Sequence, residues 1–202
     1  MKVIGITGGV GSGKSEVLKF LASRERAVVC QSDEVAKILQ RKGTACFEMI
    51  VEHFGGSILA EDGELSRSAL AEIVFHDKNE LLSLNAIVHP AVEDYIRNWI
   101  CEEKKKETEL FFLETALLIE ANYDELFCDE VWYVYANDEV RVKRLKYSRG
   151  YSDDKIEAIM NSQRTKEEYM DACDRVIDNS RSFEETSVQI LHILDKIAEE
   201  NN

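Results

Sequence analysis

The sequence has one proline in 202 residues, no apolar run long enough to cross a membrane, and no excess of positive charge. The formal net charge of −14 argues against a nucleic-acid partner, because affinity for the phosphate backbone comes chiefly from lysine and arginine. Without an apolar run of about 20 residues, we expect no membrane span. The apolar run after Lys2 is too short for the core of a signal peptide. These absences favour a soluble, cytoplasmic protein.

Cysteine occurs without any spacing that indicates a bridge or a metal site. The five cysteines are odd in number, scattered and never in C-x-x-C spacing, so we expect neither a disulfide framework nor a zinc site. A reducing compartment fits this pattern. With 45% hydrophobic residues, the chain is large enough for one compact domain with one or two insertions, and we favour a monomer.

A glycine-rich segment near the amino terminus carries the clearest chemical signal. Residues 8–15, GGVGSGKS, follow a short apolar stretch and match the pattern G-x-x-x-x-G-K-[ST]. Glycines permit positive φ and close backbone approach, so that successive N–H groups can point at an anion. The lysine supplies a charge for the outer phosphates, and the last serine a hydroxyl ligand for magnesium. The predicted nucleotide-binding residues are Gly8, Gly9, Gly11, Ser12, Gly13, Lys14, Ser15 and, through its backbone N–H, Glu16.

Short apolar segments elsewhere predict a parallel sheet. They are rich in Val, Ile, Phe and Tyr without strict alternation, which is typical of strands covered by helices on both faces. The fold class is therefore α/β, a five-stranded parallel sheet wrapped by helices. The predicted strands are residues 2–7, 27–30, 109–114, 130–136 and 174–178, with crossover helices over 14–24 and 33–41.

Two insertions interrupt this core, which comprises residues 1–55, 106–137 and 172–202. About eighty residues separate the second and third strands, far more than one crossover needs, so we expect a helical lobe over about 56–105. It contains a small hairpin at Asp62-Gly63, a helix over 66–75 and a helical region over 78–103, in which Pro90 should introduce a kink or let a second helix start. The second insertion, about 138–171, is the only dense basic stretch.

A phosphate-binding loop does not by itself distinguish GTPases, ATPases and small-molecule kinases. The chain has no D-x-x-G segment and no N-K-x-D segment, which argues against a GTPase. A kinase needs an acid to receive the acceptor's proton, and Asp33, just after the second strand, is the best candidate; its alternative role is to cap the next helix. Glu114 ends the third strand, where it can hold magnesium, or can simply be a solvated strand end.

Further segments follow the loop in a specific order. They are Asp33, GELSRSALAEIVF over 63–75, His89-Pro90, Leu117-Leu118-Ile119-Glu120, Arg144-Leu145, Gln163 and Val176-Ile177-Asp178-Asn179. Each is weak alone, but their order and spacing closely resemble the bacterial dephospho-coenzyme A kinases, nearly from end to end. The resemblance implies a P-loop kinase fold, with the helical insertion as acceptor lobe and the basic insertion as lid.

The resemblance also implies a reaction, the transfer of the γ-phosphoryl group of ATP to the ribose 3′-hydroxyl of dephospho-CoA, which is the last step of coenzyme A synthesis. In this assignment Asp33 is the base, while Lys14, Mg²⁺ and the lid residue Arg144 balance charge on the transferring group. Ser15 and Glu114 would hold the metal. For Arg144, the alternative is a surface ion pair with Glu139 or Asp138.

The same resemblance assigns residues to the two substrates. Arg67, His89 and Glu120 are expected to contact the acceptor, and the fork of Arg67 suits its diphosphate. His89 can instead be a buried structural histidine. Gln163 and Asn179 are expected to meet the adenine of ATP, unless they only cap helices.

The chain departs from the family pattern at a few positions. Glu16 stands where relatives often have threonine, so only its backbone N–H can serve. Glu114 and Ala116 replace the usual aspartate and proline, which puts the magnesium shell in doubt. Arg149 lies one residue beyond the usual second lid arginine, a rotation of about 100° on a helix. Two other functions stay open: a kinase of the same architecture with another nucleoside or nucleotide acceptor, and a non-catalytic ATP-dependent switch.

Overall fold

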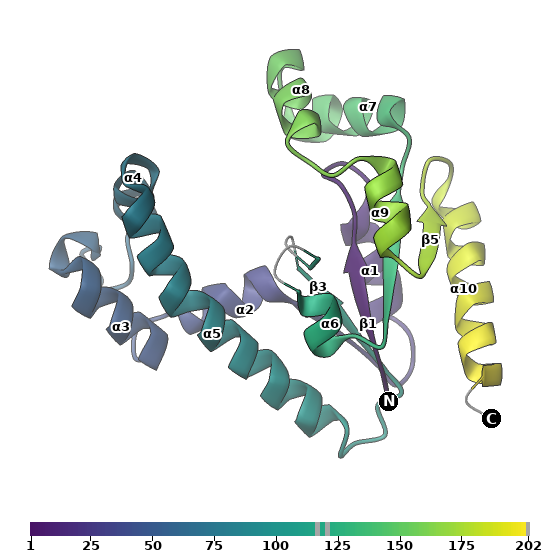
Figure 1. Cartoon of the computed structure of the whole chain (residues 1–202), viewed down its shortest axis with the longest axis horizontal. Coiled ribbons are helices and arrows are strands. Elements are labelled where there is room, and N and C mark those ends of the chain that lie inside the picture. The colour runs from purple at the N-terminus through teal and green to yellow at the C-terminus, as the bar shows by residue number, and fades with distance from the viewer. Residues whose placement is uncertain (116–117, 120–121, 201–202) are drawn as a thin grey trace. The chain divides into compact units, whose positions relative to one another are not determined.

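The computed structural model describes residues 1–115, 118–119 and 122–200. The chain forms two compact units, one made of residues 1–29 and 107–202 and the other of residues 30–106 (Figure 1). The second unit begins before the helical insertion that we predicted over 56–105, because it also takes in the segment that follows the second strand. The division into core, acceptor lobe and lid stays a prediction.

The sheet has five strands in the order β2-β3-β1-β4-β5. The central strand β1 pairs in parallel with β3 and with β4, and β4 pairs in parallel with β5. The strands are β1 (Lys2–Thr7), β2 (Ala27–Gln31), β3 (Leu110–Glu114), β4 (Glu130–Tyr135) and β5 (Arg175–Asp178). The predicted α/β fold and its five strands are confirmed, with strand ends that differ by one residue at most.

Both faces of this sheet are buried, which explains why its strands do not alternate in polarity. On one face, Ile4, Phe112 and Trp132 pack with residues of α1 and α10 in a single apolar cluster. Phe112 and Trp132 meet edge to face at 5.7 Å between ring centroids. The intervening residues, such as Phe111 and Tyr133, are buried as well.

The first unit carries six helices among the residues that the structure describes. They are α1 (Lys14–Ala22), α6 (Tyr123–Phe127), α7 (Asp138–Arg149), α8 (Asp153–Asn161), α9 (Lys166–Ala172) and α10 (Phe183–Glu200). In the predicted lid, each helix starts at a side chain that accepts a backbone N–H: Asn137, Ser152 and Thr165. These caps fix where α7, α8 and α9 begin.

The second unit is helical, with α2 (Ser32–Leu39), α3 (Ala45–Phe54), the 3₁₀ turn η1 (Gly56–Ile58), α4 (Arg67–His76) and the long α5 (Lys78–Glu103). The helix α5 packs against α2, α3 and α4 and forms the spine of the unit. At the predicted hairpin, Leu59 and Leu65 form an antiparallel bridge, and Gly63 has a φ of 78°. α5 continues through Pro90 as one helix, so no second helix starts there.

Candidate nucleotide-binding site

The glycine-rich loop connects β1 to α1, at the carboxyl edge of the sheet. Gly13 precedes the helix with a φ of 90°, and a Cβ atom there would lie 2.2 Å from Nδ2 of Asn179. A Cβ atom on Gly8 would lie 2.4 Å from the carbonyl oxygen of Val134. Side chains are therefore excluded at both ends of the loop by its conformation and by its close neighbours.

Two arginines of α7 hold the carbonyl groups of the loop. Arg141 donates from Nε to the carbonyl oxygen of Val10 at 3.1 Å. Arg144 donates to the carbonyl oxygen of Ser12 at 3.0 Å and to that of Asn179 at 2.9 Å. In a trans peptide the C=O and the following N–H point in opposite directions. The N–H groups of the residues after Val10 and Ser12 are thus turned away from the arginines.

These N–H groups are available to a ligand. Those of Gly11, Gly13 and Ser15 make no hydrogen bond within the described part of the chain. The hydroxyl of Ser12 is also buried without a partner there, although the residue is only 2% exposed. Lys14 donates from Nζ to the carbonyl oxygen of Gly8 at 2.5 Å, so its charge lies over the loop. Aligned donors at the start of a helix, beside an ammonium group, form a binding site for an anion such as phosphate.

Gln163 and Asn179 both support the loop from elsewhere in the chain. The side-chain oxygen of Gln163 accepts the N–H of Val10 at 3.1 Å and an N–H of Arg141 at 2.6 Å. Asn179 is fully buried; its Nδ2 donates to the carbonyl oxygen of Ser12 at 2.8 Å, and its Oδ1 accepts from the hydroxyl of Thr186 at 2.9 Å. Both residues hold the loop rather than cap a helix, and the predicted adenine contacts stay a prediction.

The structure does not support the surface ion pair that was the alternative for Arg144. Its side chain donates to backbone carbonyls of the loop and of the segment after β5, and the ion pair with Asp138 is made by Arg141 instead. Arg149 takes another direction: its side chain hydrogen-bonds Tyr151 and thereby lowers the pKa of that phenol. Of these two arginines, Arg144 contacts the phosphate loop and Arg149 contacts Tyr151.

The predicted metal ligands lie at the same edge of the sheet. Ser15 is exposed at the start of α1, as is Glu16, whose side chain makes no hydrogen bond or ion pair with the described residues. Glu114 ends β3 opposite Ile6 of β1, one residue before β1 ends. No group of three or more His, Cys, Asp or Glu side chains suited to a metal ion occurs within the described ranges. A hydroxyl and a carboxylate nevertheless suit Mg²⁺, which takes few protein ligands when substrate phosphates supply others.

Three of the predicted acceptor residues, Asp33, Arg67 and His89, belong to the second unit. Asp33 is the second residue of α2 and is exposed; the helix has no side-chain cap, so the capping alternative for Asp33 is wrong. Arg67 is exposed at the first position of α4. His89 is half-buried on α5, so it is not the fully buried structural histidine that was the alternative. Glu120 lies outside the described residues.

The sequence did not single out two residues of the site. Arg141, whose side chain is 12% exposed, was only one of many cations in the basic stretch. Its spacing of three from Arg144, which places both on one helix face, was the signal available. Thr186, fully buried in α10, had no such signal, because its role depends on the distant Asn179.

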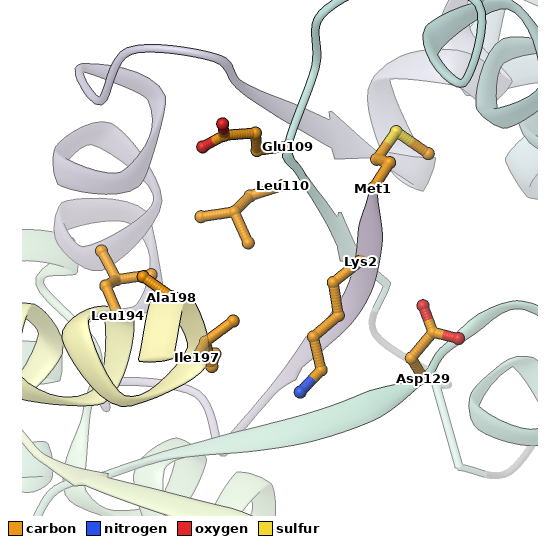
Figure 2. A pocket seen from close by; sticks show the side chains of 8 residues that line it. All are labelled: Met1, Lys2, Glu109, Leu110, Asp129, Leu194, Ile197 and Ala198. Carbon is orange, nitrogen blue, oxygen red and sulfur yellow. The ribbon is translucent and has the colours of Figure 1, made fainter. Parts of the chain in front are cut away.

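A separate cavity of about 620 Å³ lies at the opposite edge of the sheet (Figure 2). Lys2 and Leu110 begin β1 and β3, whereas the phosphate loop follows the other end of β1. Leu194, Ile197 and Ala198 of α10 line its other side. This cavity is no part of the nucleotide-binding site.

Comparison with known proteins agrees with the geometry. The family model described as dephospho-CoA kinase matches residues 2–185. The dephospho-CoA kinase of Carboxydothermus hydrogenoformans is 39% identical over 97% of this chain and 94% of its own length. Among solved structures, TT1252 from Thermus thermophilus has a TM-score of 0.78 and 31% identity, covering 96% of this chain and 97% of its own. The dephospho-CoA kinase from Campylobacter jejuni, at 24% identity, shares the fold with a TM-score of 0.71 over 99% of this chain and 98% of its own.

A family model that spans nearly the whole chain, a near full-length relative and an intact phosphate loop on the expected P-loop kinase fold lead to one assignment: the chain belongs to the dephospho-CoA kinase family.

Proposed function

We propose that this protein transfers the γ-phosphoryl group of ATP to the ribose 3′-hydroxyl of dephospho-CoA, giving coenzyme A and ADP. The proposal rests on the geometry of the phosphate loop. Arg141 and Arg144 donate hydrogen bonds to carbonyl oxygens of the loop, so that the adjacent N–H groups remain available to an anion. Membership of the dephospho-CoA kinase family supports the choice of reaction, with ATP as the phosphoryl donor.

In this reaction the phosphate loop, Asp33 and Arg144 would have separate roles. The loop N–H groups and Lys14 bind the β- and γ-phosphates. Asp33 takes the proton of the ribose 3′-hydroxyl. The oxygen of that hydroxyl forms a bond to the γ-phosphorus, while the bond between this phosphorus and the bridging oxygen of ADP breaks. Arg144 hydrogen-bonds the carbonyl oxygen of Ser12 at 3.0 Å, and we propose that its side chain turns to the transferring group when the substrates bind. Its positive charge would stabilise the negative charge that spreads over the phosphoryl oxygens.

We propose that Ser15 and Glu114 hold Mg²⁺. The metal, when bound, would neutralise charge on the β- and γ-phosphates. The fit rests on Ser15, which is exposed at the start of α1, and on Glu114, which lies opposite Ile6 near the carboxyl end of β1. Replacement of the usual aspartate by Glu114 moves the carboxylate one methylene further from the backbone, so this chain should need a small shift of strand or metal.

Several features of the chain fit a small-molecule enzyme in a reducing compartment, which we propose to be the cytoplasm. All five cysteines are free thiols, and no described helix is long and apolar enough to cross a membrane. We expect no nucleic-acid partner, given the net charge of −14, and a monomer in solution.

The test is an acceptor panel. Purified protein with ATP and Mg²⁺ is offered dephospho-CoA, AMP, CMP or shikimate, and ADP release is followed by a coupled assay. We expect turnover with dephospho-CoA and a 3′-phosphorylated product by mass spectrometry. Turnover only with another acceptor would reassign the substrate, and ATP binding without acceptor-stimulated turnover would indicate a non-catalytic switch.

A further inference from the structure

Val10 lies in the middle of the glycine-rich loop, and side chains from distant segments hold both of its backbone groups. Its N–H donates to Oε1 of Gln163 at 3.1 Å, and its carbonyl oxygen accepts from Nε of Arg141 at 3.1 Å. The two side chains also bind each other, because Nη2 of Arg141 donates to the same Oε1 at 2.6 Å. Arg141 and Gln163 therefore act on Val10 as one pair.

This pair fixes the peptide groups on either side of Val10. The carbonyl oxygen of Gly9 accepts the N–H of Ser12 at 3.1 Å, so the peptide group between Gly9 and Val10 is held at both of its polar atoms. The next peptide group is held at its oxygen by Arg141, which leaves the N–H of Gly11 facing away from that arginine. That N–H makes no hydrogen bond within the described residues. The pair thus sets the direction of a donor that is available to a phosphate oxygen.

Gly9 supplies an independent observation on the same pair. The three other glycines of the loop have a positive φ, but Gly9 does not, so its backbone conformation does not require glycine. A Cβ atom there would, however, lie 2.6 Å from Nη2 of Arg141 and 3.0 Å from Oε1 of Gln163. A side chain at position 9 would therefore displace the pair from Val10.

The contacts of Arg141 depend on the shape of its guanidinium group. Nε serves Val10, Nη2 serves Gln163, and Nη1 donates to Asp138 at 3.2 Å. The arginine side chain is only 12% exposed, whereas that of Asp138 is 75% exposed, so the ion pair itself should contribute little. A lysine carries one nitrogen and cannot reproduce the fork that reaches both Val10 and Gln163.

We propose that Arg141 and Gln163 are positioning residues for the phosphoryl donor, which hold Val10 so that the N–H of Gly11 points at a phosphate oxygen of ATP. Both act through Val10 and need not touch the phosphates. A loop that is already in its binding conformation loses less conformational entropy when the ligand binds, so binding is tighter. The inference rests on the proposed function only in taking ATP as the donor. It gives Gln163 a role in place of the adenine contact that the sequence resemblance implies.

The test compares the binding of ATP and of inorganic tripolyphosphate, which has no base, to the full chain and to Gln163→Met and Arg141→Met. Calorimetry measures ATP binding, and displacement of a fluorescent ATP analogue measures tripolyphosphate binding. In both variants we expect the two Kd values to rise by the same factor, about tenfold or more, as for the loss of a hydrogen bond that involves a charged group. Weaker binding of ATP with unchanged binding of tripolyphosphate would assign Gln163 to the adenine and overturn the proposal.

Gly9→Ala tests the pair from the other side. This variant should weaken the binding of both ligands, because the new methyl group displaces the pair. Combined with Arg141→Met, it should add little to the effect of Arg141→Met alone, since residues that act as one unit are not additive. Effects of Gly9→Ala and Arg141→Met that multiply in the double variant would show that the two sites act independently, and would overturn the proposal.

Two further variants separate position from charge. Arg141→Lys keeps the charge but loses the fork, so it should recover at most part of the binding lost in Arg141→Met; wild-type binding would show that charge alone suffices and would overturn the positioning role. Lys143→Gln removes an exposed charge from the same helix, α7, and should bind both ligands as the wild type does. A loss as large as that of Arg141→Met would likewise attribute the effect to charge.

Failure of the proposed function has a different signature. A wild type that binds ATP and tripolyphosphate but does not phosphorylate dephospho-CoA would contradict the proposed reaction, while the comparison of variants would still decide the role of the pair. A wild type that binds neither ATP nor tripolyphosphate would overturn both, because the loop would then hold no phosphates.

Discussion

Asp33 occupies the second position of α2, where a carboxylate is common for helix stability alone. Its side chain, however, is exposed and accepts no hydrogen bond or ion pair from residues 1–115, 118–119 or 122–200. The helix begins without a side-chain cap, so the capping role that was the alternative to catalysis does not apply to Asp33. This is the residue at which the proposed chemistry is most directly tested.

We expect Asp33→Asn to lower kcat by about 10² to 10⁴, which is the usual share of general-base catalysis. The Kd for ATP should change by no more than a few fold. Steady-state kinetics with dephospho-CoA and a separate ATP titration make the two measurements. Glu72→Gln, an exposed carboxylate on α4, is the control and should behave as wild type. Normal turnover in a folded Asp33→Asn protein would remove Asp33 from the role of base.

The cysteines differ sharply in environment. Cys101 is exposed, while Cys30 and Cys46 are buried. Burial, with a smaller effect of nearby carboxylates, raises the pKa of Cys128 and of Cys173 to about 12. At pH 8 a thiol with that pKa is ionised in about one molecule in 10⁴.

Because the thiolate is the reactive form, iodoacetamide at pH 8 should label Cys101 about a hundredfold faster than Cys128 or Cys173. Peptide mass mapping over time measures the three rates. In Cys101→Ser the fast phase should disappear while the slow labelling remains. Similar rates at the three positions would contradict the burial of Cys128 and Cys173.

At the scale of elements, the turn between β1 and α1 is held by contacts from distant parts of the first unit. It is fixed by its own conformation, by two arginines of α7 and by Asn179 after β5. Gly13 and Gly43 have almost the same φ, 90° and 89°, but only Gly13 has close neighbours. Substitutions at these two glycines can therefore separate two contributions to the free energy of unfolding: the strain of a positive φ and the close approach to Asn179.

We expect Gly43→Ala to destabilise the protein by about 1–2 kcal/mol, the cost of a left-handed conformation for a residue with a Cβ atom. Gly13→Ala should cost more, because its Cβ atom would also lie 2.2 Å from Nδ2 of Asn179. It should also weaken ATP binding by more than tenfold, whereas Gly43→Ala should not. Urea unfolding and ATP titration measure the two effects. Equal destabilisation by the two variants would show that the Asn179 contact carries no cost.

At the scale of the whole molecule, one ion cluster joins the start of β1 to β4, β5 and α10. Glu130 is 7% exposed and pairs with Lys2 at 2.6 Å and with Arg175, while Trp132 donates its indole N–H at 2.7 Å. Burial by itself raises the pKa of this carboxyl, but the hydrogen bonds from Arg175, Lys2 and Trp132 outweigh it and lower the pKa from its usual value of 4.5. The ionised form is thus favoured in the folded protein.

This lowered pKa predicts a pH-dependent part of stability. The contribution of Glu130 should be fully present above the pKa of the unfolded chain and lost as the pH falls below 4.5 through the folded pKa. We expect Glu130→Gln to lower the free energy of unfolding by about 2 kcal/mol at pH 7, less than for a fully buried pair because Lys2 and Arg175 are partly exposed.

Urea unfolding of both proteins at pH 7 and at several values below 4.5 measures this effect. The difference between wild type and Glu130→Gln should shrink as the pH falls. Glu109→Gln is the control, since its pair with Arg26 is exposed and should contribute little at any pH. A difference that does not depend on pH would contradict the assigned role of Glu130.

Much of this protein is determined locally by the sequence. The strands were predictable because a run such as Leu110–Leu113 is apolar on both faces and too short for a helix. The phosphate loop was predictable because positive φ and a following helix require glycine at fixed positions, so the pattern lies within eight neighbouring residues. Caps such as Thr165 likewise act within one turn of chain.

Tertiary structure alone decided which distant residues serve the loop. Arg141 meets Val10 across 131 residues of sequence, and Asn179 meets Ser12 across 167, distances over which no periodicity carries information. The same holds for Arg41, in the turn after α2, and Arg67, at the start of α4, which line one cavity of the second unit. Local patterns select the conformation of each segment, whereas packing of the sheet and helices decides which side chains meet, and that packing depends on the whole chain.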